Sequence, residues 1–160
     1  MAQLETAGAL IDFEDSGAPR MEWDLNPDSF LDSDGAQFAE IGVPGMSHPR
    51  IQYSAGGART LSFALPLHYG ALRGDRTVAQ SVDLLRSWLY PDYKSGIMTK
   101  APHRLLVCFG DRWRDEKWVL TQVDVEYLRF DKDGEPLHAM ASLTLTEYIE
   151  KSRGREEIKR

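Results

Sequence analysis

The sequence predicts a mainly β protein, an antiparallel β-barrel or sandwich of about seven strands with one flanking helix. Three observations support this fold class. Several segments alternate apolar and polar residues with a period of two, as half-buried strands do. The two most regular of them, residues 119–127 and 137–145, are separated by a turn sequence and predict a long hairpin. Residues 77–90 have the spacing of an amphipathic helix.

Length and composition predict one globular domain, residues 1–150, followed by a short charged tail, residues 151–160. Of the 160 residues, 42% are hydrophobic, enough for a genuine core. The chain lacks both an apolar run of about 20 residues and the pattern of a secretory signal, so we expect assembly in the cytosol and no membrane partner. The net charge of −6 argues against tight binding of nucleic acid, which requires cationic side chains.

The N-terminal part of the chain predicts three strands, the second and third ended by turn residues. Residues 9–13 form a modest candidate. Residues 21–25 alternate apolar and acidic side chains until Asn26-Pro27 ends the strand. A weaker strand over residues 37–43 ends at Pro44-Gly45, a typical turn pair.

A tight hairpin is predicted around Gly56-Gly57, which separates two strand-like segments, residues 50–54 and 58–67. Glycine adopts a positive φ without steric cost, so at least one of the two glycines is expected to do so in the turn. Pro66 has no N–H to donate, which predicts an edge position or a strand end. The side chains expected on the buried face of the second segment are Leu61, Phe63, Leu65 and Leu67.

The middle of the chain predicts the helix and one buried strand. Thr77 is expected to cap the helix and Pro91 to stop it. The helix is expected to cover an open face or end of the sheet with its apolar stripe. Residues 104–109 then predict a strand in which Cys108 is an inert core thiol. The apolar stripe of the helix comprises Val78, Val82, Leu85 and Leu89.

The closing hairpin is the strongest structural prediction. Its turn is expected at Asp131-Lys132-Asp133-Gly134, with Gly134 in the left-handed region. Polar residues, among them Asp124 and Glu126, are expected on its outer face, where they meet water or a hydrophilic partner. The expected inward side chains are Val119, Thr121, Val123, Val125 and Tyr127 on the first strand and Leu137, Ala139, Ala141, Leu143 and Leu145 on the second.

No pattern in the chain indicates a catalytic residue, a metal site or a cofactor. The four histidines form no i, i+4 pair and have no other ligand at metal-binding spacing. An EF-hand loop with Gly134 at its sixth position would need Arg129 and Met140 as ligands, and neither binds calcium. A hydrolase that uses the acidic loops is the least supported function. Trp113 lies in a loop dense with charge, which favours either an interface or a local cation–π contact.

Three elements of the chain, in order, resemble a known family. Gln52-Tyr53, Gly56-Gly57 and then Arg59-Thr60-Leu61-Ser62-Phe63 are similar to the N-terminal domain of contractile injection system tube proteins. Upstream, Asn26-Pro27-Asp28-Ser29-Phe30 resembles the early Asn-Pro-x-Ser-Phe element of that family. Downstream, residues 119–148 resemble its closing hairpin. The resemblance covers residues 24–148, which is most of the chain.

The resemblance implies a β-barrel with a helix at its side and a structural role rather than an enzymatic one. It implies that six copies form a ring. The other partners that it implies are the baseplate hub and spike protein and the inner tail tube protein. DNA would pass through the channel without tight binding, and the expected location is the baseplate of a phage virion. The expected interface or turn residues are Asn26, Pro27, Tyr53, Gly56, Gly57, Arg59 and Trp113, and the expected channel-facing residues are Asp124 and Glu126.

The chain departs from longer members of the family, which continue into a LysM domain that binds peptidoglycan. Only residues 149–160 follow the closing hairpin here, so cell-wall binding is not expected. Two other functions stay open. One is a tail-completion or terminator protein at the other end of the tube. The other is a small-ligand-binding β-barrel, which requires an interior cavity with a few polar groups.

Overall fold

The computed structural model describes residues 8–23, 25–70 and 76–150. Asp24 and the tail predicted over residues 151–160 lie outside these ranges. The described residues form eleven strands and one helix, which confirms the mainly β class with a flanking helix. The elements are β1 (Gly8–Asp12), β2 (Arg20–Trp23), β3 (Phe30–Ser33), β4 (Ala36–Ile41), β5 (Arg50–Gly56), β6 (Thr60–His68), α1 (Val78–Ser87), β7 (Asp92–Lys94), β8 (Ile97–Lys100), β9 (Arg104–Cys108), β10 (Lys117–Phe130) and β11 (Pro136–Glu147).

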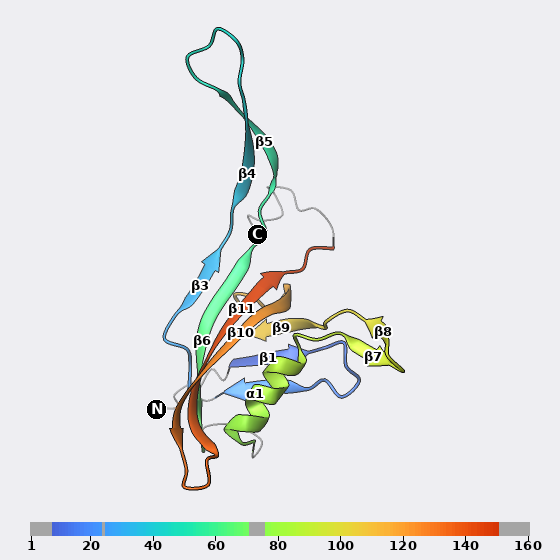
Figure 1. The fold of residues 1–160 in the computed structure, drawn as a ribbon, viewed down its shortest axis with the longest axis vertical. Helices are drawn as coiled ribbons and strands as arrows, with labels where there is room; N and C mark the ends of the chain where they lie inside the picture. The colour runs from blue at the N-terminus through green and yellow to red at the C-terminus, as the bar shows by residue number, and fades with distance from the viewer. Residues whose placement is uncertain (1–7, 24, 71–75, 151–160) are drawn as a thin grey trace.

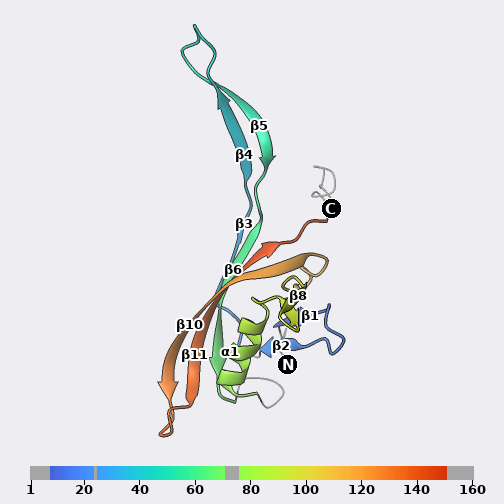
Figure 2. The same cartoon turned by 45° about the vertical axis from the view of Figure 1, so that its right-hand side comes forward.

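Seven strands form one antiparallel sheet in the order β2-β1-β9-β10-β11-β6-β3. This order is linear, so the described strands do not close into a barrel and the sandwich description fits better. In Figure 1, β1, β2 and β9 run across the direction of β6 and β11, and α1 lies beside them. The pairs β4–β5 and β7–β8 form two separate two-stranded sheets, and each projects from the body of the molecule in Figure 1. Figure 2 shows the β4–β5 pair from a second side.

The hydrophobic core lies between the inner face of the seven-stranded sheet and α1. Every second residue of β6 is buried, as the alternation predicts, and the same holds along most of β11. Burying a side chain of this size stabilises the fold by roughly 1.5–3 kcal/mol. The largest fully buried side chains include Trp23, Trp118, Leu10, Met21, Leu61, Leu65, Leu67, Leu85, Leu105, Leu143 and Leu145.

Helix α1 begins at the predicted cap. The Thr77 hydroxyl accepts a hydrogen bond from the backbone N–H of Gln80, and the Gln80 side chain accepts one from the N–H of Thr77, both at 3.2 Å. This capping box satisfies two donors at the helix start that otherwise lack partners. The helix ends at Ser87, earlier than predicted, because the N–H groups of Leu89 and Tyr90 bond to the carbonyls three residues back and tighten the chain.

The inner face of β10 differs from the prediction. Trp118 and Leu120 are buried, whereas Thr121 is exposed. A register shift between Leu120 and Gln122 leaves Thr121 as an extra residue in the strand, and a bulge of this kind moves the following side chains to the other face. The expectation that Val119 and Thr121 point inward is therefore wrong, while Val123 packs against the core as expected.

The predicted hairpin at Gly56-Gly57 is also wrong. Strand β5 pairs with β4, where Phe38 lies opposite Tyr53, and β6 pairs instead with β11 and β3. Neither glycine has a positive φ. The turn of this region lies earlier, where Gly45 has a φ of 85°, and the turn of the closing hairpin has Gly134 at 86°, as predicted.

Candidate assembly surfaces

The β4–β5 hairpin forms an arm at one end of the long axis of the molecule (Figure 1 and Figure 2). Every residue from 36 to 56 is exposed. Phe38 and Tyr53 lie opposite each other, with their ring centroids 5.8 Å apart in an edge-to-face arrangement. Together with Ile51, which is 68% exposed, they form an apolar face that nothing in the described chain covers. A grouped apolar surface of this kind is typical of an interaction site.

The root of the arm is fixed by a cluster of charged side chains. The Arg59 guanidinium donates from Nε to Asp32 Oδ1 at 2.8 Å and from Nη2 to Asp32 Oδ2 at 2.7 Å. It also donates to Glu116 at 2.7 Å, lies 3.7 Å from Glu147, and stacks over the Trp118 ring at 5.5 Å. Hydrogen bonding to Arg59 lowers the pKa of Asp32, and the carboxylates raise the pKa of Arg59.

A hydrogen bond between two backbone groups also closes the root of the arm. The N–H of Gly57 donates to the carbonyl of Gly35 at 2.7 Å, which joins the end of the arm to its beginning. A Cβ on Gly57 would lie 2.9 Å from that carbonyl oxygen, whereas a Cβ on Gly56 would meet only the Tyr53 hydroxyl at 3.6 Å. Of the glycine pair, Gly57 is therefore the one that the fold requires, for close approach of two backbones rather than for a turn.

Trp113 lies in the core rather than on a surface, so its assignment to an interface is wrong. Its side chain is 7% exposed, and its ring packs against Phe30 with centroids 5.0 Å apart. The indole Nε1 donates to Asp32 Oδ2 at 3.1 Å, which also contributes to the lowered pKa of that carboxyl. Arg59 is likewise occupied within its own chain, not displayed to a neighbour.

The outer face of β6, β10 and β11 carries mostly polar side chains. Asp124 and Glu126 are exposed on β10, as predicted, and Ser62 lies 3.4 Å from the Thr144 hydroxyl across the β6–β11 pair. No lysine or arginine lies among the side chains of this strip from residue 142 to 146 or from 60 to 66. Apart from Arg129, which lies opposite His138, the face therefore offers hydroxyls and carboxylates, which do not attract phosphate.

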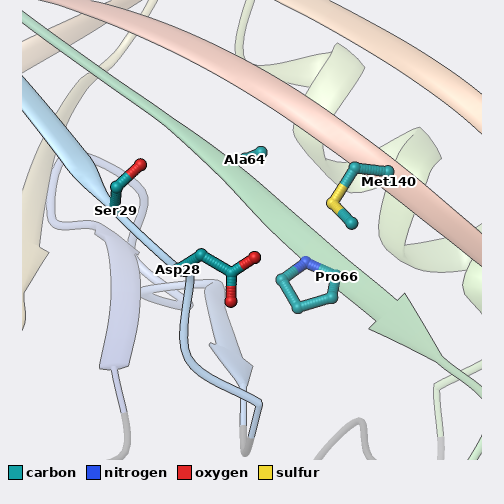
Figure 3. Close-up of a pocket in the computed structure, with 5 residues that line it drawn as sticks. All are labelled: Asp28, Ser29, Ala64, Pro66 and Met140. Carbon is teal, nitrogen blue, oxygen red and sulfur yellow. The ribbon is translucent and has the colours of Figure 1, made fainter.

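A shallow pocket of about 280 Å³ opens on the same face. Figure 3 shows Ala64 and Pro66 on β6, Met140 on β11, and Asp28 and Ser29 on the segment that leads into β3. Both polar residues are exposed. A ligand site of the kind found inside β-barrels needs an enclosed cavity with fixed polar groups, and this pocket has neither.

The β7–β8 hairpin projects from the side of the molecule and is anchored at its base by His103. The imidazole Nδ1 lies 2.7 Å from Asp12 Oδ2, and Nε2 lies 2.9 Å from Asp92 Oδ2. Hydrogen bonding to Asp12, and then to Asp92, raises the pKa of His103. Because both ring nitrogens donate to carboxylates, neither is available as a catalytic base.

The remaining predicted residues lie in loops. Asn26 is exposed and Pro27 is buried in the connection between β2 and β3. A stacked pair that the sequence reading missed, His68 and His138, lies across the β6–β11 pair with ring centroids 3.7 Å apart. Only the register of two strands distant in the chain brings this pair together.

Among the residues with described positions, no group of three or more side chains is arranged to hold a metal ion.

Comparison with known proteins gives one finding that bears on all these surfaces. The model of a family described as contractile injection system tube protein matches residues 8–156. A search of curated proteins finds no match. Within the described ranges, no helix is long and apolar enough to cross a lipid bilayer.

Proposed function

This chain belongs to the contractile injection system tube protein family, and we propose that it forms the ring at the baseplate on which the inner tail tube starts. The family gives the protein a structural role in the tail of a phage or a related secretion machine, where it assembles with itself and with other tail components. In the proposed position the ring joins the hub and spike protein to the tube protein. Each copy of this chain in the ring consists of one domain, residues 1–150, and catalyses no reaction.

The main support for an axial ring is the outer face of the closing hairpin. Asp124 and Glu126 are exposed there beside serine and threonine hydroxyls. We place this face toward the channel, because carboxylates repel phosphate and let DNA slide without adhering. Six copies, each of net charge −6, carry a total of −36, so the interfaces between copies and with neighbouring layers must offset considerable repulsion.

Two open strand edges support ring closure. In the described part of the chain β3 pairs only with β6, and from residue 120 onward β10 pairs only with β11. Such edges present unpaired backbone groups and invite pairing with another chain. An element of one copy that adds to the open β3 edge of the next copy makes a head-to-tail contact between identical chains, which closes into a ring when the rotation permits.

The arm supports contact with an adjacent layer. The arm, which carries the exposed Phe38, Ile51 and Tyr53, extends away from the body of the molecule along the long axis (Figure 1). Burial of roughly 25 cal/mol per Å² of apolar surface makes covering this face favourable. We propose that a hub, spike or tube subunit covers it in the assembled tail.

A reconstruction of purified tail particles in which this subunit carries a tag tests the proposal. We expect a ring of six copies on the tail axis, between hub and tube, with Asp124 and Glu126 facing the channel. A ring at the opposite end of the tube would instead assign the protein as a terminator. A position on the sheath or the fibres would contradict both the ring and the channel.

A further inference from the structure

The β7–β8 hairpin carries several large side chains that are exposed rather than packed in the core of their own chain. Tyr93, Ile97 and Met98 are 64%, 71% and 58% exposed. Lys94 and Lys100 are also exposed, and neither forms an ion pair with any residue whose position is described. In an acidic chain, this small hairpin therefore presents exposed apolar side chains together with two positive charges. Tyr93 lies opposite Met98, Lys94 lies opposite Ile97, and Lys100 lies opposite Asp92 at the hairpin base.

The hairpin is held rigidly enough to serve as a docking element. Asp92, its first residue, accepts a hydrogen bond from His103 at 2.9 Å, and the Thr99 hydroxyl donates to the Asp92 carbonyl at 3.2 Å. His103 in turn contacts the buried Asp12, which ties the hairpin base to the body of the molecule. An element fixed in advance loses less entropy when it binds.

A complementary surface lies along β3 and the segment before it. Leu25 and Leu31 are 42% and 64% exposed. Asp28 and Asp34 are exposed and have no cationic partner within the described ranges, whereas Asp32 turns inward to Arg59. This edge strip therefore offers apolar side chains with two negative charges, the inverse of the hairpin.

We propose that the β7–β8 hairpin of one copy docks on the β3 edge of the next copy, with Lys94 and Lys100 facing the carboxylates of Asp28 and Asp34. The inference rests on the proposed ring. The two surfaces lie on opposite sides of the molecule, as Figure 1 shows, so one chain cannot join them itself. Identical copies that present unlike surfaces on opposite sides associate head to tail. Opposite charges on the two surfaces set the register of that contact.

The first test maps the contact in assembled tail particles. A photo-crosslinking residue, introduced as Ile97→p-benzoylphenylalanine, is irradiated in the particle and the product is identified by mass spectrometry. We expect a crosslink to residues 25–34 of a second copy. A crosslink to the hub, the tube, the sheath or the arm of another copy would overturn the inference.

Charge reversal gives the second test, in cells that produce all the tail proteins. Lys94→Glu with Lys100→Glu, or Asp28→Lys with Asp34→Lys, is expected to lower the yield of rings about tenfold or more. Combining all four changes is expected to restore much of the yield. Arg86→Glu with Lys132→Glu changes the charge equally at exposed positions on α1 and in the β10–β11 turn, away from both surfaces, and is the matched control. Equal loss in the control, or no recovery in the combined variant, would contradict the proposed contact.

The two proposals fail separately. If the reconstruction of unmodified particles shows no axial ring, both the proposed function and this contact are wrong. If it shows the ring but Ile97 crosslinks elsewhere, the function stands and only the hairpin contact is wrong.

Discussion

Arg59 and Asp32 form a two-point ion pair that joins the residue before β6 to the middle of β3, with N–O distances of 2.8 and 2.7 Å. Asp32 lies where the chain enters the arm, and Arg59 lies where the chain leaves it. The pair therefore fixes the direction in which the arm leaves the sheet. It also explains why Arg59 is not displayed to a neighbouring copy.

Removing Arg59 is expected to destabilise the folded protein strongly. Arg59→Met leaves Asp32 and Glu116 without their partner in a partly buried cluster, which costs on the order of 3 kcal/mol in the free energy of unfolding. Arg59→Lys is expected to recover only part of this, since lysine cannot bind a carboxylate at two points. Urea unfolding measures both. Arg20→Met, which breaks an exposed pair with Glu22, is the control and should change stability by less than about 0.5 kcal/mol. Equal effects at Arg20 and Arg59 would refute the special role of the cluster.

The two adjacent glycines are expected to differ in tolerance. Gly57→Ala forces a Cβ to within 2.9 Å of the Gly35 carbonyl oxygen, and relieving this contact costs about 1–3 kcal/mol. Gly56→Ala meets only a side-chain hydroxyl and is expected to stay within about 0.5 kcal/mol of the unmodified protein. Thermal unfolding of the two variants measures the difference. Two equally stable variants would show that the root of the arm is not closed by this backbone contact.

Trp113 is expected to act through stability and not through a surface contact. Trp113→Ala removes a buried ring and is expected to cost about 3–5 kcal/mol. Trp113→Phe keeps most of the packing but loses the hydrogen bond to Asp32, at a cost of about 1 kcal/mol. Chemical unfolding checks both values. A Trp113→Ala protein that is fully stable yet fails to assemble would show that this residue acts in a contact between subunits.

The His103 cluster is expected to make stability depend on pH in one direction. Because its pKa in the folded protein is raised above the ordinary value of 6.5, protonated His103 contributes stability in full below that value. This contribution is lost as the pH rises through the raised pKa. Asp12 and Asp92 face the ring directly, and Glu14 lies close enough to interact with its charge.

Melting temperatures measured from about pH 6 to about pH 9 test this expectation. The stability advantage of the unmodified protein over a His103→Gln variant should shrink toward high pH, because glutamine does not titrate. A constant difference across this range would mean that His103 is neutral in the fold. A difference that grows with pH would show that folding lowers the pKa of His103 rather than raising it.

Several features of this protein follow from short stretches of sequence alone. The cap at Thr77 and the stripe of Val78, Val82 and Leu85 define α1, because a helix is stabilised by contacts three and four residues apart. The alternation from Leu61 to Leu67 predicts which face of β6 is buried, since successive side chains of a strand point to opposite faces. The mainly β class with one flanking helix follows from patterns of this local kind.

Tertiary structure alone decided which segments meet. The residues of β5 suit a strand that pairs with β6, as predicted, or with β4. Its partner is β4 because the chain turns at Gly45 rather than at Gly56. Local patterns do not encode the bulge at Thr121, which appears only in the pairing of β10 with β11, just past the residues that also pair with β9. In the same way Arg59 and Trp113 look like surface residues in the sequence. Trp113 is buried and Arg59 is partly buried, because Asp32, remote in the chain, supplies the hydrogen bond and the charge that offset this burial.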